Sequence, residues 1–134
     1  MNRAFLCSAI EGVVSKYGYS FTLNDEAYYP TTICRYPAAF LSQPEFVSQE
    51  GRKRGRISYK VTLRLARQGA KLSATERNTS LDEMEQQLTE MFVELSRTER
   101  VAVVRNLTIK PTAQAIDCHG AMALEAQATI ETIF

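Results

Sequence analysis

The sequence predicts a single α+β domain, residues 1–134, in which two helices cover one face of a mostly antiparallel, four-stranded sheet. Three observations support this class. The chain has 134 residues and 45% of them are hydrophobic, which is enough apolar material for the core of one ordinary domain. Two segments repeat apolar residues every three or four positions, as amphipathic helices do. Two others alternate strictly, as half-buried strands do, and the predicted element order is αββαββ.

The first predicted element is a helix that ends before Gly18, a residue type that commonly follows a helix C-terminus. Asn2 is a candidate cap at its start. The apolar face of this helix consists of Leu6, Ile10, Val13, Val14 and Tyr17. A strand is predicted over residues 31–36, between Pro30 and Pro37, because β-branched and aromatic residues are concentrated there.

Residues 42–56 predict a long, flexible hairpin arm with a basic tip. Pro44, Gly51 and Gly55 punctuate this segment, and the basic run Arg52–Arg56 lies at its end. The next segment alternates more clearly than any other in the chain. Its apolar side is formed by Ile57, Tyr59, Val61, Leu63 and Leu65, and its polar side by Ser58, Lys60, Thr62 and Arg64. The polar side either contacts water or faces a partner.

The second predicted helix begins at Ser80, because Ser80 and Glu83 have the spacing of a capping box, and residues 67–79 predict a polar loop. The apolar face of this helix consists of Leu81, Met84, Leu88, Met91, Phe92 and Leu95. Two strands close the chain. The first runs from Val101 to Ile109 with an irregularity at Arg105–Asn106, and the second alternates from Met122 to Glu131 after a turn at residues 117–120.

The net charge of +1 conceals an uneven distribution along the chain. Residues 1–42 carry three basic and three acidic side chains. Residues 43–77 carry nine basic against three acidic, a balance of +6, and residues 78–134 carry four basic against nine acidic, a balance of −5. The near-neutral total gives no general reason to expect nucleic acid or a membrane as partner. A basic middle and an acidic C-terminal half can complement one another, within one fold or between neighbouring copies.

No motif in the sequence predicts catalysis, a metal site or a cofactor. His119 is the only histidine, and the adjacent Cys118 would point to the opposite side of an extended segment, so the two make a poor nucleophile–base pair and a poor metal site. Glu90 and Glu94 share a helix face, and such a pair is more often a solvated surface than an acid–base dyad. We therefore expect a protein that is not an enzyme and that needs no cofactor.

The cysteines indicate the redox environment of the protein, and the hydropathy pattern indicates whether it enters a membrane. Cys7, Cys34 and Cys118 are odd in number and widely spaced, which fits thiols in a reducing cytoplasm better than a disulfide framework. No apolar run has the length of a membrane span, so we expect no membrane insertion.

The basic run Arg52, Lys53, Arg54 and Arg56 is the sharpest local feature of the sequence. It has three interpretations: a solubilising tip that discourages edge pairing, a contact to an acidic protein surface, or a contact to nucleic acid. The neighbouring aromatic residues show no pattern for stacking bases, so nucleic acid is the least favoured of the three. One interpretation of the whole chain is therefore a small α+β module that binds protein or nucleic acid through this arm.

The order of segments also resembles a known family. A short helix is followed by a strand segment with the sequence Tyr29-Pro30-Thr31-Thr32-Ile33, then by a long arm and the alternating strand Ile57–Leu65. A loop, a helix start with the sequence Ser80-Leu81-Asp82-Glu83-Met84 and two closing strands complete the chain. This order, length and hydrophobic pattern resemble the tail terminator and head–tail completion proteins of tailed phages and prophages over nearly the whole chain.

The resemblance implies a structural virion protein. Members of that family form rings, typically hexameric, that stop polymerisation of the tail tube and join it to the head connector. The implied partners are copies of the chain itself, the tail tube and the head connector, and the implied location is the bacterial cytoplasm during assembly and then the virion tail. The family has no catalytic residues to transfer. By position alone, Arg52–Arg56 would contact the tube or a neighbouring subunit, and the acidic helix, including Glu90 and Glu94, would form a complementary or outer surface.

Overall fold

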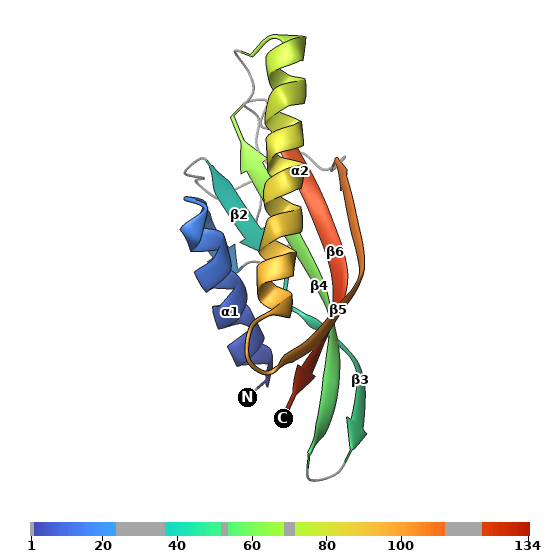
Figure 1. Cartoon of the computed structure of the whole chain (residues 1–134). Helices are drawn as coiled ribbons and strands as arrows, with labels where there is room; N and C mark the ends of the chain where they lie inside the picture. The colour runs from blue at the N-terminus through green and yellow to red at the C-terminus, as the bar shows by residue number, and fades with distance from the viewer. Residues whose placement is uncertain (1, 24–36, 52–53, 69–71, 112–121) are drawn as a thin grey trace.

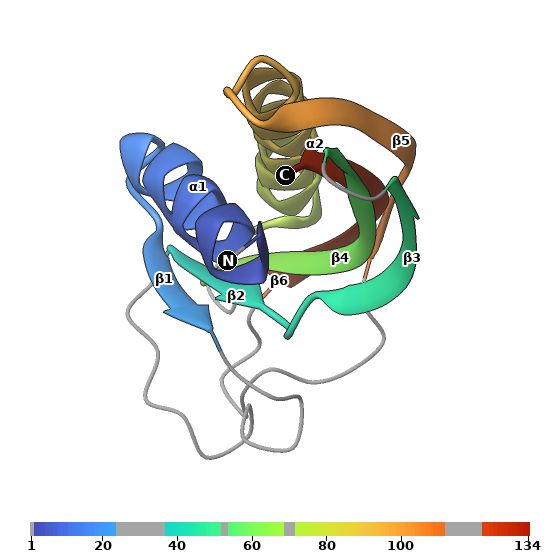
Figure 2. The same cartoon turned by 90° about the horizontal axis from the view of Figure 1, so that it is seen from below.

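Two helices lie on one face of a curved sheet in the computed structural model, which describes residues 2–23, 37–51, 54–68, 72–111 and 122–134 (Figures 1 and 2). The helices are α1 (Asn2–Lys16) and α2 (Ala74–Ser96). The strands in the described ranges are β1 (Ser20–Leu23), β2 (Ala38–Leu41), β3 (Glu45–Gly51), β4 (Gly55–Arg67), β5 (Val101–Pro111) and β6 (Met122–Ile133). Neither of these helices combines the length and the apolar character that crossing a membrane requires.

The sheet has the strand order β1-β2-β4-β6-β5, with β3 as a further partner of β4. β1 and β2 are parallel, and every other described pair is antiparallel. One edge of β4 is shared, because β3 pairs with its first half and β2 with its second half. The other edge pairs with β6 from Arg56 to Arg67. The long central pair β4–β6 therefore supports both the body of the domain and the hairpin formed by β3 and β4.

The predicted α+β class, the antiparallel sheet and the two helices on one face are confirmed. The predicted αββαββ order and the count of four strands were wrong, because the described chain adds the short strand β1 and the arm strand β3. Four residues such as those of β1 are too few to produce a recognisable alternation. The strand predicted at residues 31–36 lies outside the described residues, and the structure instead has β2 directly after Pro37.

The core lies between the helices and the sheet, and it consists of the apolar faces that the sequence predicts. Alternation along β4 and β6 sends Tyr59, Val61, Leu63 and Leu65, together with Leu124, Ala126, Ala128 and Ile130, into this layer. The helices contribute Leu6, Ile10, Val13 and Val14 from α1 and Met84, Leu88, Met91, Phe92 and Leu95 from α2. Each large apolar side chain that is fully buried stabilises the fold by about 1.5–3 kcal/mol, so this layer dominates the stability.

Both ends of α1 are fixed by specific contacts. Gly18 follows the helix with a φ of 83°, as predicted for the residue after a helix C-terminus. Asn2 does not cap the start: it is buried, donates from Nδ2 to Thr132 Oγ1 at 2.9 Å, and accepts from Arg100 at 3.0 Å. The Thr132 hydroxyl in turn donates to the Ile57 carbonyl at 2.9 Å. These bonds join the start of α1 to β6 and β4 where the hairpin leaves the body.

The predicted start of the second helix at Ser80 was wrong. The helix begins at Ala74, and its capping box is formed by Ser73 and Glu76 rather than by Ser80 and Glu83. Ser73 Oγ accepts from the Glu76 backbone N–H at 3.2 Å, and the Glu76 carboxylate accepts from the Ser73 N–H at 3.4 Å. Both serines have a glutamate three residues later, so the local capping chemistry did not distinguish the two sites. Residues 74–79, predicted as loop, form the first turns of the helix.

Replacing Ser73 with alanine should lower the free energy of unfolding by about 1 kcal/mol, because the Glu76 N–H loses its acceptor at the helix start. Chemical denaturation followed by circular dichroism measures this change. Ser73→Asp supplies an equivalent acceptor and should retain the wild-type midpoint. Equal losses in the two variants, or no loss in either, would contradict the assigned helix start.

The irregularity predicted in the first closing strand is confirmed. The β5–β6 register shifts between Arg105 and Thr108, and Asn106 has a φ of 55°. Asparagine tolerates this left-handed conformation better than most residues with a side chain. The shift lets β5 follow the sheet while Leu107 and Ile109 still pack against the core.

Candidate assembly interface

The hairpin of β3 and the first half of β4, which we call the arm (residues 45–60), projects beyond the layer that the helices cover (Figure 1). All seven residues of β3 are exposed. The pairing runs from Glu45–Lys60 to Gly51–Gly55, and Gly51 adopts a φ of 93° that favours glycine at the turn. The predicted arm thus contains a hairpin, whose register shifts between Phe46 and Ser48. Of its predicted basic residues, Arg52 and Lys53 lie outside the described residues.

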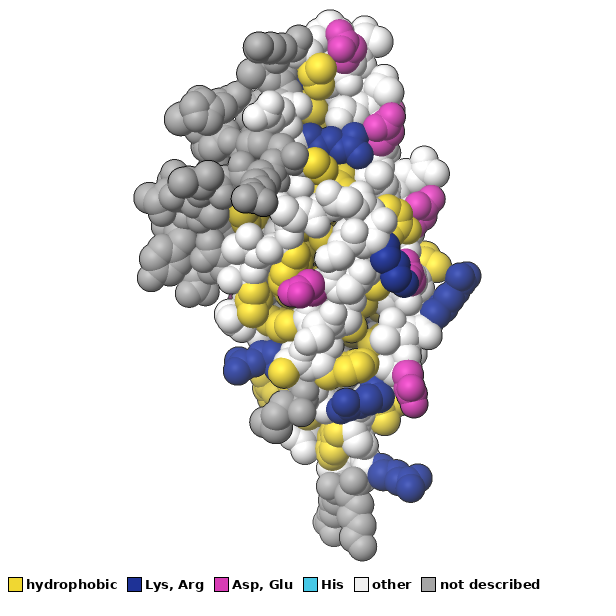
Figure 3. Space-filling view, turned by 90° about the vertical axis from the view of Figure 1, so that its left-hand side faces the viewer, with side chains coloured by type: hydrophobic (Ala, Val, Ile, Leu, Met, Phe, Trp, Pro, Cys, Tyr) yellow, Lys and Arg dark blue, Asp and Glu magenta, His cyan; other side chains and the backbone are white. Residues whose placement is uncertain are grey.

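The arm exposes apolar as well as basic side chains. Phe46 is 61% exposed and Val47 is 54% exposed, although Phe46 also contacts the Tyr59 ring edge-on at a centroid distance of 6.4 Å. The end of β6 adds Ile133, which is 42% exposed, and the backbone of Phe134 pairs with Gly55. Figure 3 shows the arm as the narrow lower end of the molecule, with apolar and basic side chains beside each other there. The sequence pattern predicted the basic tip of the arm but not these exposed apolar side chains.

Arg54 and Arg56 are exposed, but their surroundings differ. Arg56 approaches Glu131 of β6 at 3.5 Å, and Arg105 of β5 approaches the same carboxylate at 3.0 Å. Arg54 forms no ion pair with another described residue. Of the described basic residues in the predicted run, Arg54 is therefore the one most available to a partner.

The polar side of β4 is partly buried in contacts within the subunit. Arg64 and Glu125 lie directly opposite each other in the β4–β6 register, with a 2.7 Å ion pair between buried side chains. Lys110 of β5 approaches the same carboxylate at 3.7 Å. Phe40, Ala38 and Ala66 form a small apolar cluster on this face, with Ala123 packed against it. The side predicted to be wet or to face a partner is therefore partly a second, polar core.

A groove of about 620 Å³ lies between the exposed side of α2 and β5. Its lining consists of Asp82, Glu85, Gln86, Thr89, Glu90, Leu107 and Ile109. Among the described residues, neither Asp82 nor Glu85 forms an ion pair. Because Leu107 and Ile109 also pack against the core, the groove has an apolar side on β5 and an acidic side on α2. We call it the acidic groove.

The two carboxylates singled out in the sequence have different surroundings. Glu94 forms an ion pair with Lys16 at the end of α1, so its negative charge is partly neutralised within the subunit. Glu90 lines the acidic groove and accepts hydrogen bonds from Gln86 at 3.2 Å and from Tyr17 at 3.5 Å. Desolvation raises the pKa of Tyr17, and the charges of Glu90 and Glu94 raise it further, so this hydroxyl remains a donor at neutral pH. Glu90, but not Glu94, is therefore placed to meet a partner in the groove.

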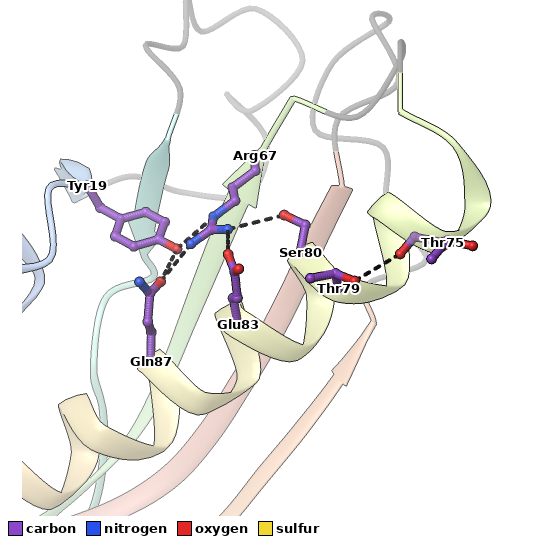
Figure 4. Close-up of polar contacts among 7 residues, drawn as sticks. All are labelled: Tyr19, Arg67, Thr75, Thr79, Ser80, Glu83 and Gln87. Carbon is purple, nitrogen blue, oxygen red and sulfur yellow. Dashed lines mark hydrogen bonds and ion pairs between the residues drawn. The ribbon is translucent and has the colours of Figure 1, made fainter.

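A further polar cluster surrounds Arg67 at the end of β4 (Figure 4). Its guanidinium donates to Glu83 at 2.9 Å, Gln87 at 3.0 Å, and Ser80 and Tyr19 at 3.2 Å. Desolvation raises the pKa of the Tyr19 phenol, so the hydroxyl stays protonated beside the cation. The cluster joins β4, α2 and the segment after α1, which is a structural connection between elements.

The described residues contain no group of three or more His, Cys, Asp or Glu side chains arranged to hold a metal ion. Cys7 lines a second groove, between α1 and β1, and desolvation raises the pKa of its thiol, which disfavours the reactive thiolate. Cys34, Cys118 and His119 lie outside the described residues. Two comparisons with known proteins were negative: no family model matches the chain, and no curated protein matches it.

Proposed function

We propose that the chain is a structural subunit that assembles into a closed ring, as phage tail terminators do, and that this ring caps a tail tube and joins it to the head connector. The observation that carries the proposal is the arm, a hairpin that extends beyond the helix-covered body and exposes Phe46 and Val47 near its base and Arg54 at its tip. Large apolar side chains grouped at one end of a small domain are typical of a contact surface.

The backbone of the arm supports the same proposal. Within the described ranges, β3 pairs only with β4, so its outer edge has no strand beside it. Free edges of this kind invite pairing with other chains unless charge or another covering segment protects them. The arm has charges at its tip and apolar side chains near its base. The charges discourage unspecific edge pairing, and the apolar side chains offer a contact to a specific partner. Assembly in which the arm contacts a different surface of the next copy joins two unlike patches, the geometry that closes rings.

The proposal gives the chain no catalytic role and requires no cofactor. The buried Arg64–Glu125 pair and the Arg67 cluster connect secondary-structure elements within the subunit. The partners in this proposal are further copies of the chain, a tail-tube protein and a head connector protein. Its location is the bacterial cytoplasm during assembly and the virion tail afterwards.

Sedimentation velocity of the nuclease-treated protein, at low and at high salt, tests the proposal. We expect oligomers at low salt that dissociate as salt screens the contacts between basic and acidic surfaces. A strict monomer at high protein concentration and low salt would contradict the ring. Association that disappears with nuclease treatment would instead favour a nucleic-acid-binding module acting through the arm.

A further inference from the structure

We propose that the arm of one subunit docks into the acidic groove of the next subunit, with Arg54 facing Glu85 and with Phe46 and Val47 against the apolar side of the groove. This inference rests on the proposed function and names the two surfaces that would meet in the ring. The occupant of the groove is thus a second copy of this chain.

Complementary charge is the first argument. Residues 45–60 contain five basic side chains, namely Arg52, Lys53, Arg54, Arg56 and Lys60, against two acidic ones, Glu45 and Glu50, a balance of +3. The groove lining contains three carboxylates and no basic residue. Surfaces of opposite sign attract one another, favour one orientation and discourage contact between like surfaces, so arm–groove pairs are favoured over arm–arm pairs.

Complementary apolar surface is the second argument. Phe46 and Val47 each expose more than half of their surface, and Leu107 and Ile109 form the apolar side of the groove. Contact between these two pairs removes apolar surface from water on both subunits. The charges set the orientation of the two subunits, and the buried apolar contact contributes most of the binding free energy.

The tip of the arm, with Arg54, cannot reach the groove of its own subunit. The tip is at the Gly51–Gly55 pair, whereas Ile109 of the groove lies opposite Ala126, which lies opposite Leu63. Eight strand positions separate Gly55 from Leu63, roughly 26 Å at the rise of an extended strand. The contact therefore joins different patches on different copies, and such a contact propagates from subunit to subunit and forms a ring when the rotation between neighbours closes.

A charge exchange tests the docking. Arg54→Glu and Glu85→Arg should each weaken self-association by about tenfold or more, because each places like charges in contact. The double variant restores opposite charges, so its association should return to within about threefold of wild type, which a merely structural effect would not produce. Sedimentation velocity at low salt gives the association constants, and circular dichroism checks that each variant folds.

The matched control exchanges Arg97 and Glu99, both exposed in the turn after α2 and outside the two surfaces. Arg97→Glu with Glu99→Arg should leave association unchanged. If the wild type assembles but the double variant at positions 54 and 85 is not rescued, the docking is wrong and the proposed function stands. If the wild type is a strict monomer, both are wrong. If Arg54→Glu removes retention on duplex DNA while the wild-type mass stays monomeric, the arm binds nucleic acid, which also overturns the docking.

Discussion

Replacing Phe46 and Val47 with serine should weaken self-association by at least about 30-fold while the subunit remains folded. The two side chains are 61% and 54% exposed, so the isolated subunit gains little from them. Burial against a neighbouring copy would contribute about 2 kcal/mol from the pair, and about 1.4 kcal/mol corresponds to a tenfold change in association. Sedimentation velocity at low salt measures the association. The edge-on contact of Phe46 with Tyr59 contributes about 1 kcal/mol, which sets the expected loss of subunit stability.

Val93 provides the matched control for this double variant. It is an exposed apolar residue at 45%, and it lies on α2 outside the lining of the acidic groove. Val93→Ser should leave association at the wild-type level. An equal loss in both proteins would mean that general surface polarity rather than the arm controls assembly, and no loss in either would exclude the arm as the contact.

Replacing Glu125 with leucine should destabilise the subunit by about 3–5 kcal/mol, because it leaves the Arg64 guanidinium buried without its carboxylate. Both side chains are less than a tenth exposed, so water cannot replace the missing charge. A loss of this size is a large part of the 5–15 kcal/mol that stabilises a typical domain, and it should lower the melting temperature by about 10–20 °C. Denaturant titration and thermal melting give the two values.

The double variant Arg64→Met with Glu125→Leu distinguishes desolvation from a general loss of packing. Removing both charges should restore the stability to within about 1 kcal/mol of wild type, because apolar side chains then occupy a buried site. As a comparison, Glu94→Leu removes the partner of Lys16 at the surface, where an ion pair contributes less than about 1 kcal/mol. A loss for Glu125→Leu no greater than that for Glu94→Leu would contradict the burial of the pair.

The parts of the fold that were predictable from the sequence are those with a strong repeat. Leu63 and Leu65, like Leu124 and Ile130, alternate with polar neighbours on long strands, and this pattern has one arrangement that buries the apolar side. Asn106 was recognisable as an irregularity because asparagine and its arginine neighbour interrupt the apolar pattern. The apolar repeat of a strand or helix does not depend on which strands are neighbours, so a single sequence was sufficient to predict which residues are buried.

Two kinds of feature were not predictable. In one, two sites in the sequence carried the same local signal, and in the other, two residues far apart in the chain became partners in the sheet. Ser73 and Ser80 offered the same capping chemistry, and the helix uses the earlier one although its first turn is exposed. Arg64 and Glu125 are far apart in the chain, and only the β4–β6 register makes them partners. Polar residues at both positions gave no local sign that they would be buried.

The candidate interface was predictable in charge but not in shape. The basic run and the acidic helix are visible in the sequence, yet the groove exists only because β5 lies beside α2 and presents Leu107 and Ile109 to it. Similarly, Glu90 and Glu94 looked equivalent until α1 placed Lys16 beside one of them. The exposure of Phe46 follows from the projection of the arm beyond the body, which a hydrophobic pattern does not encode.

The size and shape of the assembled particle test directly whether the chain forms a closed ring. Negative-stain electron microscopy of the nuclease-treated protein at low salt, with native mass spectrometry of the same sample, gives both. We expect closed rings with a single copy number, six if the chain assembles as tail terminators do. Monomers alone at high protein concentration, or open filaments of variable length, would contradict it.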